Sequence, residues 1–499
     1  MDSVPLSKIF RRLLSHQTCS KLRYHDPTPR KLNTIYYGRR YYRKSRGDEE
    51  YREDKQLSNW QQRTEILPPD KLQEYQKAPM VNANGLRSRR ERPKGVKMLT
   101  RDFIDDSLYN PNYGYFPKHA TIFTPGKPFD FNALADEPAF HRELGKRYTS
   151  FEDDLDAESF NETRQLWHTP TELFLPYYGE AIARYLVTNY KLSHHPYHDL
   201  IIYELGAGNG TLMLNILDYI RDYHPDVYPR TKFKVIEISS ALATLQTNQL
   251  TRTASSRGHV GHVEIINRSI FAWDTYLPAP CYFLALEVFD NFAHDSIRYD
   301  PITEVPLQGT VLIDAEGSFY DFYVRDIDPE VRHFLQVRHA ACTRSFDHPL
   351  QEQKWLRAFK SSLPFAPNLT HPEYIPTRLL QFFEILHQYF PLHQLLTSDF
   401  HSLPGTVKGF NAPAVQTRYK RRTVPVTTPY VMQGYFDILF PTNFAMMEDL
   451  YRAVTGKLTK VTSHAEWLRR WAYTEDTQCK SGENPMLSWY ENSSVMLST

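Results

Sequence analysis

The sequence predicts an α/β fold in which mostly parallel strands alternate with helices around a ligand-binding turn. The first observation is the apolar run Leu-Ile-Ile-Tyr at residues 200–203, typical of a strand buried on both faces. The second is a set of three glycines, Gly206, Gly208 and Gly210, just after that run. The third is the apolar helical face of residues 212–220, which completes a strand–turn–helix unit.

The glycine turn has the spacing Gly-x-Gly-x-Gly, with Glu204 just before it. This spacing differs from the Gly-x-Gly-x-x-Gly of dinucleotide-binding enzymes. Glycines lack a Cβ, so the backbone can turn sharply and approach a ligand closely. The alternative is a glycine-rich turn that binds nothing. The strand before the turn and the helix after it favour a ligand-binding turn.

Length and composition limit the class of protein. A chain of 499 residues can hold several domains or one domain with long insertions. A net charge of +1 gives no overall basic field, so nucleic acid is not an expected partner. Four cysteines without a Cys-x-x-Cys pair predict neither a metal site nor a disulfide framework. No apolar run approaches the roughly 20 residues of a membrane span.

The N-terminal segment is basic and amphipathic. Basic residues recur from Lys8 to Arg46, and Asp26 is the single acid among them. The apolar residues near the start fall on one helical face: Leu6, Ile9, Phe10, Leu13 and Leu14. This pattern predicts a mitochondrial transit peptide over residues 1–46 and a protein of the mitochondrial matrix. The alternatives are a solvated basic tail or an RNA-binding arm.

The rest of the chain divides by composition. Residues 47–96 are dense in charged side chains and poor in aliphatic ones, which predicts a disordered linker. Order is expected from residue 97, in an N-terminal part over 97–195, which we name the cap, and in the core of the fold, with insertions, over 196–475. The polar residues 476–499 predict a loose C-terminal tail.

Within the cap, residues 99–109 predict a short helix, and an aromatic turn containing Tyr113 and Tyr115 follows it. Residues 124–163 show no clear period and predict a loop or insertion. A helix is then expected to open at Thr169, with Pro170 in its first turn and Glu172 completing a capping box. That local role is sufficient to explain Thr169 and Glu172.

Acids and small residues follow the next two predicted strands. Glu237 ends the strand predicted over 232–238, about 30 residues past the glycines and near the spacing of a ribose-binding acid. Its two carboxylate oxygens can accept both ribose hydroxyls. Ser269 and Ile270 follow the third strand, 263–268, where such folds place an adenine ring.

Two further acids, Glu287 and Asp290, follow the fourth predicted strand, 282–286. The carboxyl ends of parallel strands face the crevice in which doubly wound sheets bind ligands. Their position therefore favours a functional role for both. The alternative is that one caps a helix and the other is a solvated loop acid.

The C-terminal half is expected to continue the same pattern. Residues 310–314 and 319–324 alternate and predict a hairpin. Residues 404–428 predict a basic loop. The other expected elements are a helix at 377–389, a fifth strand at 393–399, a late strand at 436–440 and a helix at 446–454.

Several separated motifs together resemble the MidA-type methyltransferases, which occur in bacteria and in mitochondria. The matching segments are 110–116, 169–172, 178–180, 204–212, 236–239, Glu287 with Asp290, 322–329 and 437–444. Ala207 and Asn209 stand where the family usually has Pro and Arg, and Leu286 stands where Asn or His is usual.

The resemblance implies a class I methyltransferase fold, Rossmann-like, with a seven-stranded, mostly parallel sheet, a helical N-terminal cap and a methyltransferase core over 196–475. It implies S-adenosyl-L-methionine as the cofactor and dimethylation of an arginine in a subunit of respiratory complex I, so the expected partner is a protein substrate. The implied cofactor contacts are Glu204, Gly206, Gly208, Asn209, Gly210, Glu237, Ile238, Ser269 and Ile270. The implied acceptor contacts are Tyr113, Tyr115, Thr169 and Glu172, and the implied catalytic residues are Glu287 and Asp290.

The residue types suit this chemistry. Methyl transfer depends largely on positioning, and an arginine acceptor is a cation that carboxylates can hold. No metal is required. Two other classes stay open: an assembly or scaffold protein that binds the cofactor without turnover, and a methyltransferase that acts on RNA or a small molecule.

Overall fold

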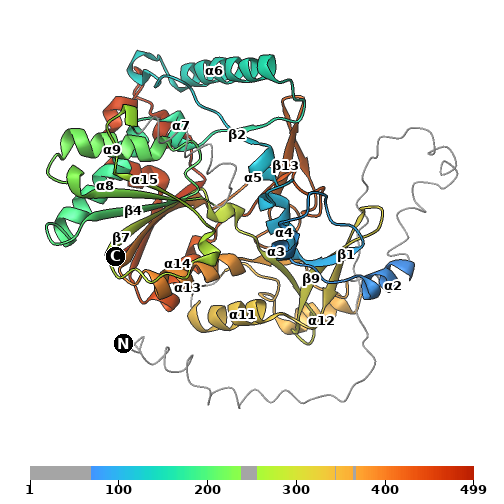
Figure 1. The fold of residues 1–499 in the computed structure, drawn as a ribbon. Helices are drawn as coiled ribbons and strands as arrows, with labels where there is room; N and C mark the ends of the chain where they lie inside the picture. The colour runs from blue at the N-terminus through green and yellow to red at the C-terminus, as the bar shows by residue number, and fades with distance from the viewer. Residues whose placement is uncertain (1–68, 238–254, 343, 345, 364–366) are drawn as a thin grey trace.

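The computed structural model describes residues 69–237, 255–342, 344, 346–363 and 367–499. At its centre lies a seven-stranded sheet with the order β16-β17-β12-β7-β4-β5-β6 (Figure 1). The five strands from β12 to β6 are parallel, and β17 is antiparallel to both of its neighbours. The predicted class of fold is therefore confirmed. The strands are β4 (Leu200–Leu205), β5 (Thr231–Glu237), β6 (Val263–Asn267), β7 (Cys281–Leu286), β12 (His393–Phe400), β16 (Thr459–Ser463) and β17 (Ser493–Ser498).

Helices cover both faces of this sheet (Figure 1). One layer contains α8 (Tyr177–Ser193), α9 (Thr211–Tyr223) and α15 (His464–Trp471), and the other contains α11 (Pro329–Ala341), α13 (Thr377–Tyr389) and α14 (Phe444–Thr455). Successive side chains of β4 enter opposite layers: Leu200 and Ile202 pack in the first core, and Tyr203 and Leu205 pack in the second. Burial on both faces is the physical reason for the apolar run in the sequence.

A second sheet supports the cap. It contains β1 (Val96–Leu99), β9 (Pro306–Ile313), β8 (Asp295–Tyr299) and β11 (Glu373–Ile375), and β10 (Phe319–Val324) pairs with β9. The predicted hairpin is confirmed, since Phe319 pairs with Ile313 across the turn. Helix α4 (Thr100–Tyr109) packs on this sheet through Phe103 and Leu108. The cap is therefore built from residues before and after the glycine turn.

The prediction of a disordered linker up to residue 96 is wrong for the part that the structure describes. Residues 69–96 contain α2 (Pro69–Lys77) and α3 (Ala83–Leu86). Tyr75 stacks on Phe322 with ring centroids 4.2 Å apart, and its hydroxyl lies 2.9 Å from Thr310 Oγ1. A few large side chains that dock on the second sheet thus order a segment of charged composition. The transit peptide predicted over 1–46, and the linker as far as residue 68, lie outside the described residues.

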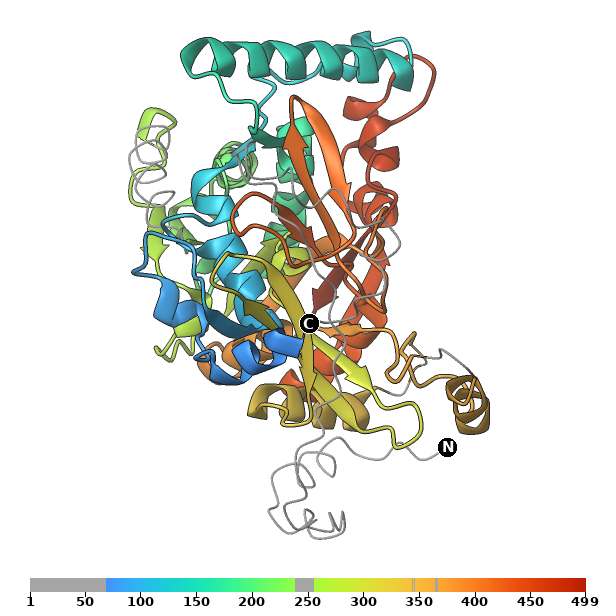
Figure 2. The ribbon, with the colours of Figure 1, turned by 90° about the vertical axis from the view of Figure 1, so that its right-hand side faces the viewer.

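Residues 124–163, predicted as a loop, contain the 22-residue helix α6 (Glu137–Glu158). Asp136 caps its start by accepting from the backbone N–H of Ala139, and Pro138 occupies its first turn. The helix gives no apolar stripe in the sequence because its buried residues are limited to Phe140, Leu144 and Glu152. It lies across the outer edge of the molecule, above the parallel strands β2 (Ala120–Ile122) and β3 (Gln165–Trp167) (Figures 1 and 2).

Residues 404–428, also predicted as a loop, form the hairpin of β13 (Ala414–Tyr419) and β14 (Arg422–Val426). The late strand β15 (Asp437–Leu439) pairs with β13 in this three-stranded sheet. Figure 2 shows the hairpin extending toward α6. Lys420 and Arg421, at its tip, have φ of 48° and 63°, a left-handed pair that hairpin turns usually fill with Asn or Gly.

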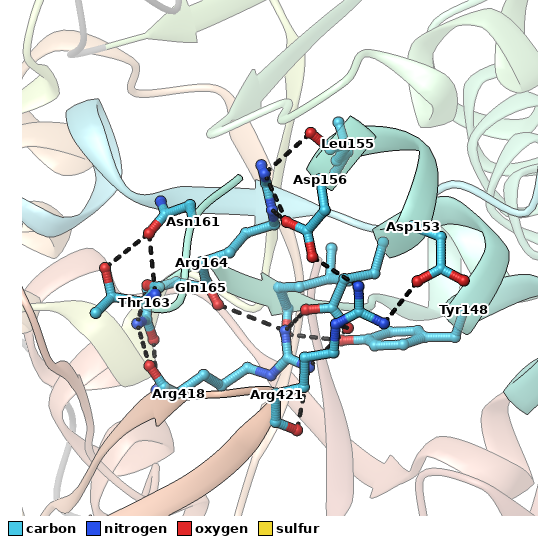
Figure 3. Close-up of polar contacts among 12 residues, drawn as sticks. Tyr148, Asp153, Leu155, Asp156, Asn161, Thr163, Arg164, Gln165, Arg418 and Arg421 are labelled. Atoms are coloured by element: carbon cyan, nitrogen blue, oxygen red, sulfur yellow. Dashed lines mark hydrogen bonds and ion pairs between the residues drawn. The ribbon is translucent and has the colours of Figure 1, made fainter. Parts of the chain in front are cut away.

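Ion pairs between the hairpin and α6 hold this unusual turn (Figure 3). Arg421 contacts Asp153 at 2.7 Å and Asp156 at 2.6 Å, and Arg418 contacts Glu152 at 3.0 Å. Arg164 adds a 3.1 Å contact to Asp156. These six residues, which we name the clasp, join two segments more than 250 positions apart in the chain.

Replacing Arg421 by Gln is expected to loosen α6 without unfolding the protein. The substitution removes the three ion pairs that Arg421 makes with Glu152, Asp153 and Asp156, but Arg421 is on the surface, where single contacts contribute little. We expect amide hydrogen exchange over residues 137–158 to rise roughly two- to fivefold, because local opening becomes easier. Arg221→Gln on α9, which removes surface ion pairs with Asp218 and Asp222, is the control. Equal exchange in α6 for both variants would contradict the role of the clasp.

The tail predicted to be loose is part of the central sheet. β17 lies between β12 and β16, and Val495 and Met496 are buried. The serines of β17 interrupt its apolar pattern, so the sequence did not indicate a strand here. Ser498 is nevertheless fully buried, and its hydroxyl accepts from the backbone N–H of Leu395 at 2.7 Å. In the part of the chain that the structure describes, no helix is both long and apolar enough to span a membrane.

Candidate functional site

The glycine turn joins the carboxyl end of β4 to the start of α9. Gly206, Gly208 and Gly210 have φ of 67°, 51° and 75°, a region that favours glycine. Gly210 caps α9, so the first backbone N–H groups of that helix point toward the turn. The sequence therefore needs glycine at these three positions for backbone reasons alone.

A short helix of the cap closes over this turn. Helix α7 (Pro170–Leu173) is capped by Thr169, whose hydroxyl accepts from the backbone N–H of Glu172 at 3.3 Å, as the sequence predicts. Glu172 Oε1 accepts from Asn209 Nδ2 at 3.1 Å and from Thr211 Oγ1 at 2.7 Å. Glu172 thus contacts the glycine turn itself, whereas the resemblance implied an acceptor contact. The predicted capping box is wrong, because in the described residues the Glu172 carboxyl does not accept from the backbone N–H of Thr169.

A pocket of about 80 Å³ lies between α7 and the turn. Glu204, the glycine turn and Glu287 all line it, and Ile122 and Trp167 from β2 and β3 close it. Ile122 packs so tightly that a Cβ on Gly208 would lie 2.7 Å from its Cδ1. Acids predicted after two different strands are therefore brought together at one pocket.

Glu204 is 6% exposed and lies in strand β4, one residue before its end. Its Oε2 has no hydrogen-bond partner among the described residues. Burial, together with the charge of Glu237 at the end of β5, raises the pKa of Glu204 to about 8. An unpartnered buried carboxyl is costly by itself, so this oxygen suits a cationic group in the pocket.

The predicted adenine segment borders a larger cavity of about 520 Å³. Ser269, Phe271 and Tyr109 line it, and Ile270 is buried beside it with 2% exposure. The Tyr109 hydroxyl donates to the backbone carbonyl of Asn291 at 3.1 Å. Ile238, a predicted cofactor contact, lies outside the described residues.

Glu287 has an unusual backbone for its residue type. Its φ is 53°, in the left-handed region, and its backbone N–H donates to the carbonyl of Ser398 at 2.8 Å. Its partly exposed side chain lines the pocket at the glycine turn. Burial of the carboxyl group and the charge of Asp399 raise its pKa well above the ordinary value.

Asp290 lies deeper than Glu287. It is 2% exposed, and its Oδ1 lacks a partner within the described chain. Burial raises its pKa well above the ordinary value, as do the neighbouring acids. The short helix that contains it, η6 (Phe289–Asn291), has no side-chain cap. Glu287 and Asp290 are therefore neither a cap nor a solvated loop acid.

Sequence reasoning missed two buried acids beside this pair. Asp399, at the end of β12, is fully buried, and Asp437 accepts from Asn291 Nδ2 at 3.3 Å. The sequence could have indicated Asp399, because this residue ends the strand predicted over 393–399 and therefore lies at the same sheet edge as Glu287. Asp437 lies in a segment that resembles the family, but its strand, β15, belongs to a different sheet, so strand order did not place it beside Glu287.

The two tyrosines that the resemblance implied as acceptor contacts lie elsewhere. Tyr113 donates its hydroxyl to both oxygens of Asp106 at 2.9 Å, and Tyr115 packs in the core of the cap. Both are buried, and within the described residues neither lines the pocket at the glycine turn. These tyrosines stabilise the cap, a role that a single sequence does not separate from binding.

The residues at the turn fit the amino-acid end of S-adenosyl-L-methionine. That end carries a carboxylate and an ammonium group. The backbone N–H groups in the first turn of α9 suit the carboxylate. The unpartnered oxygen of Glu204 suits the ammonium.

Comparisons with known proteins agree with this fit. Residues 181–462 match the family described as "Putative S-adenosyl-L-methionine-dependent methyltransferase". The mitochondrial protein arginine methyltransferase NDUFAF7 homolog of Schizosaccharomyces pombe is 25% identical over 389 residues, 75% of this chain and 80% of that protein. Its counterpart from Saccharomyces cerevisiae is 20% identical over 438 residues, 83% of this chain and 92% of that protein.

A solved structure from Burkholderia thailandensis, bound to S-adenosyl-homocysteine, shares the fold. Its TM-score is 0.51 at 16% identity, covering 87% of this chain and 95% of that one. The fold, the cofactor and the relationship expected from the sequence are confirmed by these matches together. The family match spans more than half of the chain, and the chain belongs to this family of S-adenosyl-L-methionine-dependent methyltransferases.

Proposed function

We propose that this protein is a mitochondrial protein arginine methyltransferase that acts on a subunit of a respiratory complex. The observation that carries the proposal is the position of Glu287, whose carboxyl lines the same pocket as the glycine turn. A carboxylate at this position suits a cationic acceptor such as a guanidinium. The names of the two yeast relatives support arginine as the acceptor and the mitochondrion as the location.

Methyl transfer to a guanidinium requires a methyl donor and a group that accepts a proton. When bound, the cofactor supplies a methyl group on a positively charged sulfur. A guanidinium nitrogen that gains the methyl group must lose one proton, while the bond from sulfur to carbon breaks. Glu287, with its raised pKa, is suited to accept that proton, and Asp290 is a second buried acid with a raised pKa beside it.

The other site residues belong to the cofactor in this proposal. The turn holds the amino-acid end through Glu204, Gly206, Gly208, Asn209 and Gly210, while Glu237 holds the ribose and Ser269 with Ile270 border the adenine. We also assign Glu172 to the cofactor side, because it fixes Asn209 and Thr211.

Cofactor binding at neutral pH is expected to release close to one proton from Glu204. With a pKa near 8, this carboxyl is mostly protonated at pH 7 in the free protein, and an ammonium beside it favours the ionised form. Affinity should therefore rise as the pH increases toward 8. Calorimetry at pH 7 in buffers of different ionisation enthalpy measures the proton count. The release should vanish in Glu204→Gln, and an unchanged count in that variant would contradict this role.

The proposed function is tested by comparing mitochondria from cells with and without the gene. We expect one or more mitochondrial proteins to lose methylated arginine in its absence, as measured by mass spectrometry, and the protein itself to fractionate with the matrix. If the protein binds the cofactor but no arginine changes, the scaffold function is favoured. Loss of a methyl mark on RNA or a small molecule would replace arginine as the acceptor.

A further inference from the structure

We propose that Asp399 is the positioning residue for Glu287: it holds the turn that carries Glu287 at the pocket, and its negative charge makes Glu287 the proton acceptor of the pair. This inference rests on the proposed function for its consequence in methylation. Its geometric basis lies in the contacts between the ends of β7 and β12.

The carboxylate of Asp399 bridges the two strand ends. Its Oδ2 accepts from the backbone N–H groups of Phe289 at 2.9 Å and of Asp290 at 3.2 Å. Its Oδ1 accepts from the N–H of Phe400 at 2.7 Å. Because Asp399 is fully buried, these charged hydrogen bonds act in a medium that water does not screen.

These hydrogen bonds also determine where the side chain of Glu287 lies. A left-handed backbone at a glutamate is strained and persists only where its surroundings hold it. Here the N–H of Glu287 is bound by the carbonyl of Ser398, and the two residues that follow Val288 are bound by Asp399. The end of β12 therefore sets the turn and keeps the Glu287 side chain at the pocket.

The same contacts make the pKa values of Asp399 and Glu287 differ. Burial raises the pKa of both, that of Asp399 to about 7, and the backbone N–H groups of Phe289, Asp290 and Phe400 stabilise the ionised form of Asp399 and limit that rise. The carboxyl of Glu287 has no such donors among the described residues, and the charge of Asp399 raises its pKa further. Asp399 consequently ionises first, and Glu287 binds the proton. Two acids whose surroundings drive their pKa values apart are typical of acid–base sites.

Other groups facing Glu287 do not change this order. Asp290, from the same turn, is a further buried acid, and the charge of Glu287 raises the pKa of Asp290. The hydroxyls of Tyr178, on α8, and Tyr490, after α16 (Pro485–Ser488), interact with Glu287 but stay neutral, because burial raises the pKa of each. Within the described residues, no cation acts on its pKa.

The experiment is an infrared titration of the Glu287 carboxyl in the full chain without substrate. The spectrum of Glu287→Gln is subtracted from that of the parent to isolate the Glu287 band. In the Asp399→Asn background, we expect Glu287 to ionise at a pH lower by about one unit or more, since a neighbouring negative charge is gone. The lower limb of the pH profile for arginine methylation should move by the same amount.

Asp437→Asn is the matched control. It removes a buried acid that contacts the same short helix through Asn291, yet Asp437 is not among the groups that act on Glu287. This variant should leave the Glu287 titration unchanged. A folded Asp399→Asn protein whose Glu287 titrates as in the parent would overturn the proposal.

Two further outcomes are decisive. If Asp399→Asn does not fold, the parent titration decides: ionisation of Glu287 near its ordinary pKa of about 4.3 would overturn the proposal, and ionisation well above it would support it. Because the titration needs no acceptor, it is independent of the proposed function. A shifted titration in a protein that methylates no arginine refutes the function and keeps the assignment of Asp399.

Discussion

Gly208→Val is expected to abolish binding of S-adenosyl-L-methionine while the protein stays folded. Gly208 has φ of 51°, and a valine there adds a branched side chain to a left-handed backbone, at about 1–2 kcal/mol for the backbone alone. Its Cβ would also lie 2.7 Å from Ile122 Cδ1, so β2 or the turn must shift. A displaced turn no longer presents its backbone to the cofactor. Calorimetry should show affinity lower by roughly a hundredfold or more.

Gly456→Val controls for backbone strain. Gly456 ends α14 with a similar φ of 71°, but a Cβ there has no heavy atom within 4 Å. It should therefore lose stability as Gly208→Val does, as measured by thermal unfolding, and retain the affinity of the parent. Parent-like affinity in Gly208→Val would mean that the turn is structural and binds nothing.

The sequence revealed the central unit because its pattern depends on little else. The strand β4 is buried on both faces, the glycines require positive φ and α9 has an apolar face, so each element is visible from its own residues. The positions of Glu204, Glu237 and Glu287 followed from a rule of topology, since parallel strands place their carboxyl ends at one edge.

The elements that the sequence did not predict are stabilised by residues distant in the chain. Helix α6 buries few residues and is held by ion pairs with Arg418 and Arg421. Strand β17 places a buried serine, Ser498, against Leu395 by a hydrogen bond. Polar side chains that become favourable only through such pairing give no apolar period, so composition indicates loops or tails there.

The same distinction applies to the site. Glu172 was assigned to the acceptor, because nothing in its neighbourhood indicates that α7 folds onto Asn209 and Thr211. Asp399 was overlooked although its strand was predicted, since its significance lies in backbone N–H groups more than 100 positions earlier. Residue type and the positions of strand ends predict which acids lie at the same edge of the sheet. The role of each acid depends on hydrogen bonds between strands, which the sequence does not show.

Glu287→Gln is expected to lower arginine methylation sharply while cofactor affinity stays within about twofold of the parent. The substitution retains size and polarity, so the left-handed turn and its bond to Ser398 should persist. It removes a charged hydrogen bond to a guanidinium, worth about 1.5–3 kcal/mol, or at least roughly tenfold in productive binding. It also removes the proton acceptor, whose contribution to such reactions is typically about 10²–10⁴-fold. Initial rates with an arginine substrate, together with calorimetry for the cofactor, separate the two effects.

Glu304→Gln is the matched control for that experiment, because Glu304 is also a glutamate with a left-handed backbone, at φ of 61°. It pairs with Arg357 and does not line the pocket at the glycine turn. Parent-like methylation by Glu304→Gln would exclude backbone strain as the cause of a loss in Glu287→Gln. Full methylation by Glu287→Gln would remove Glu287 from the mechanism. A parallel loss of cofactor affinity and activity would assign its carboxyl to the cofactor instead of the acceptor, since a group that holds only the acceptor cannot change cofactor binding in its absence.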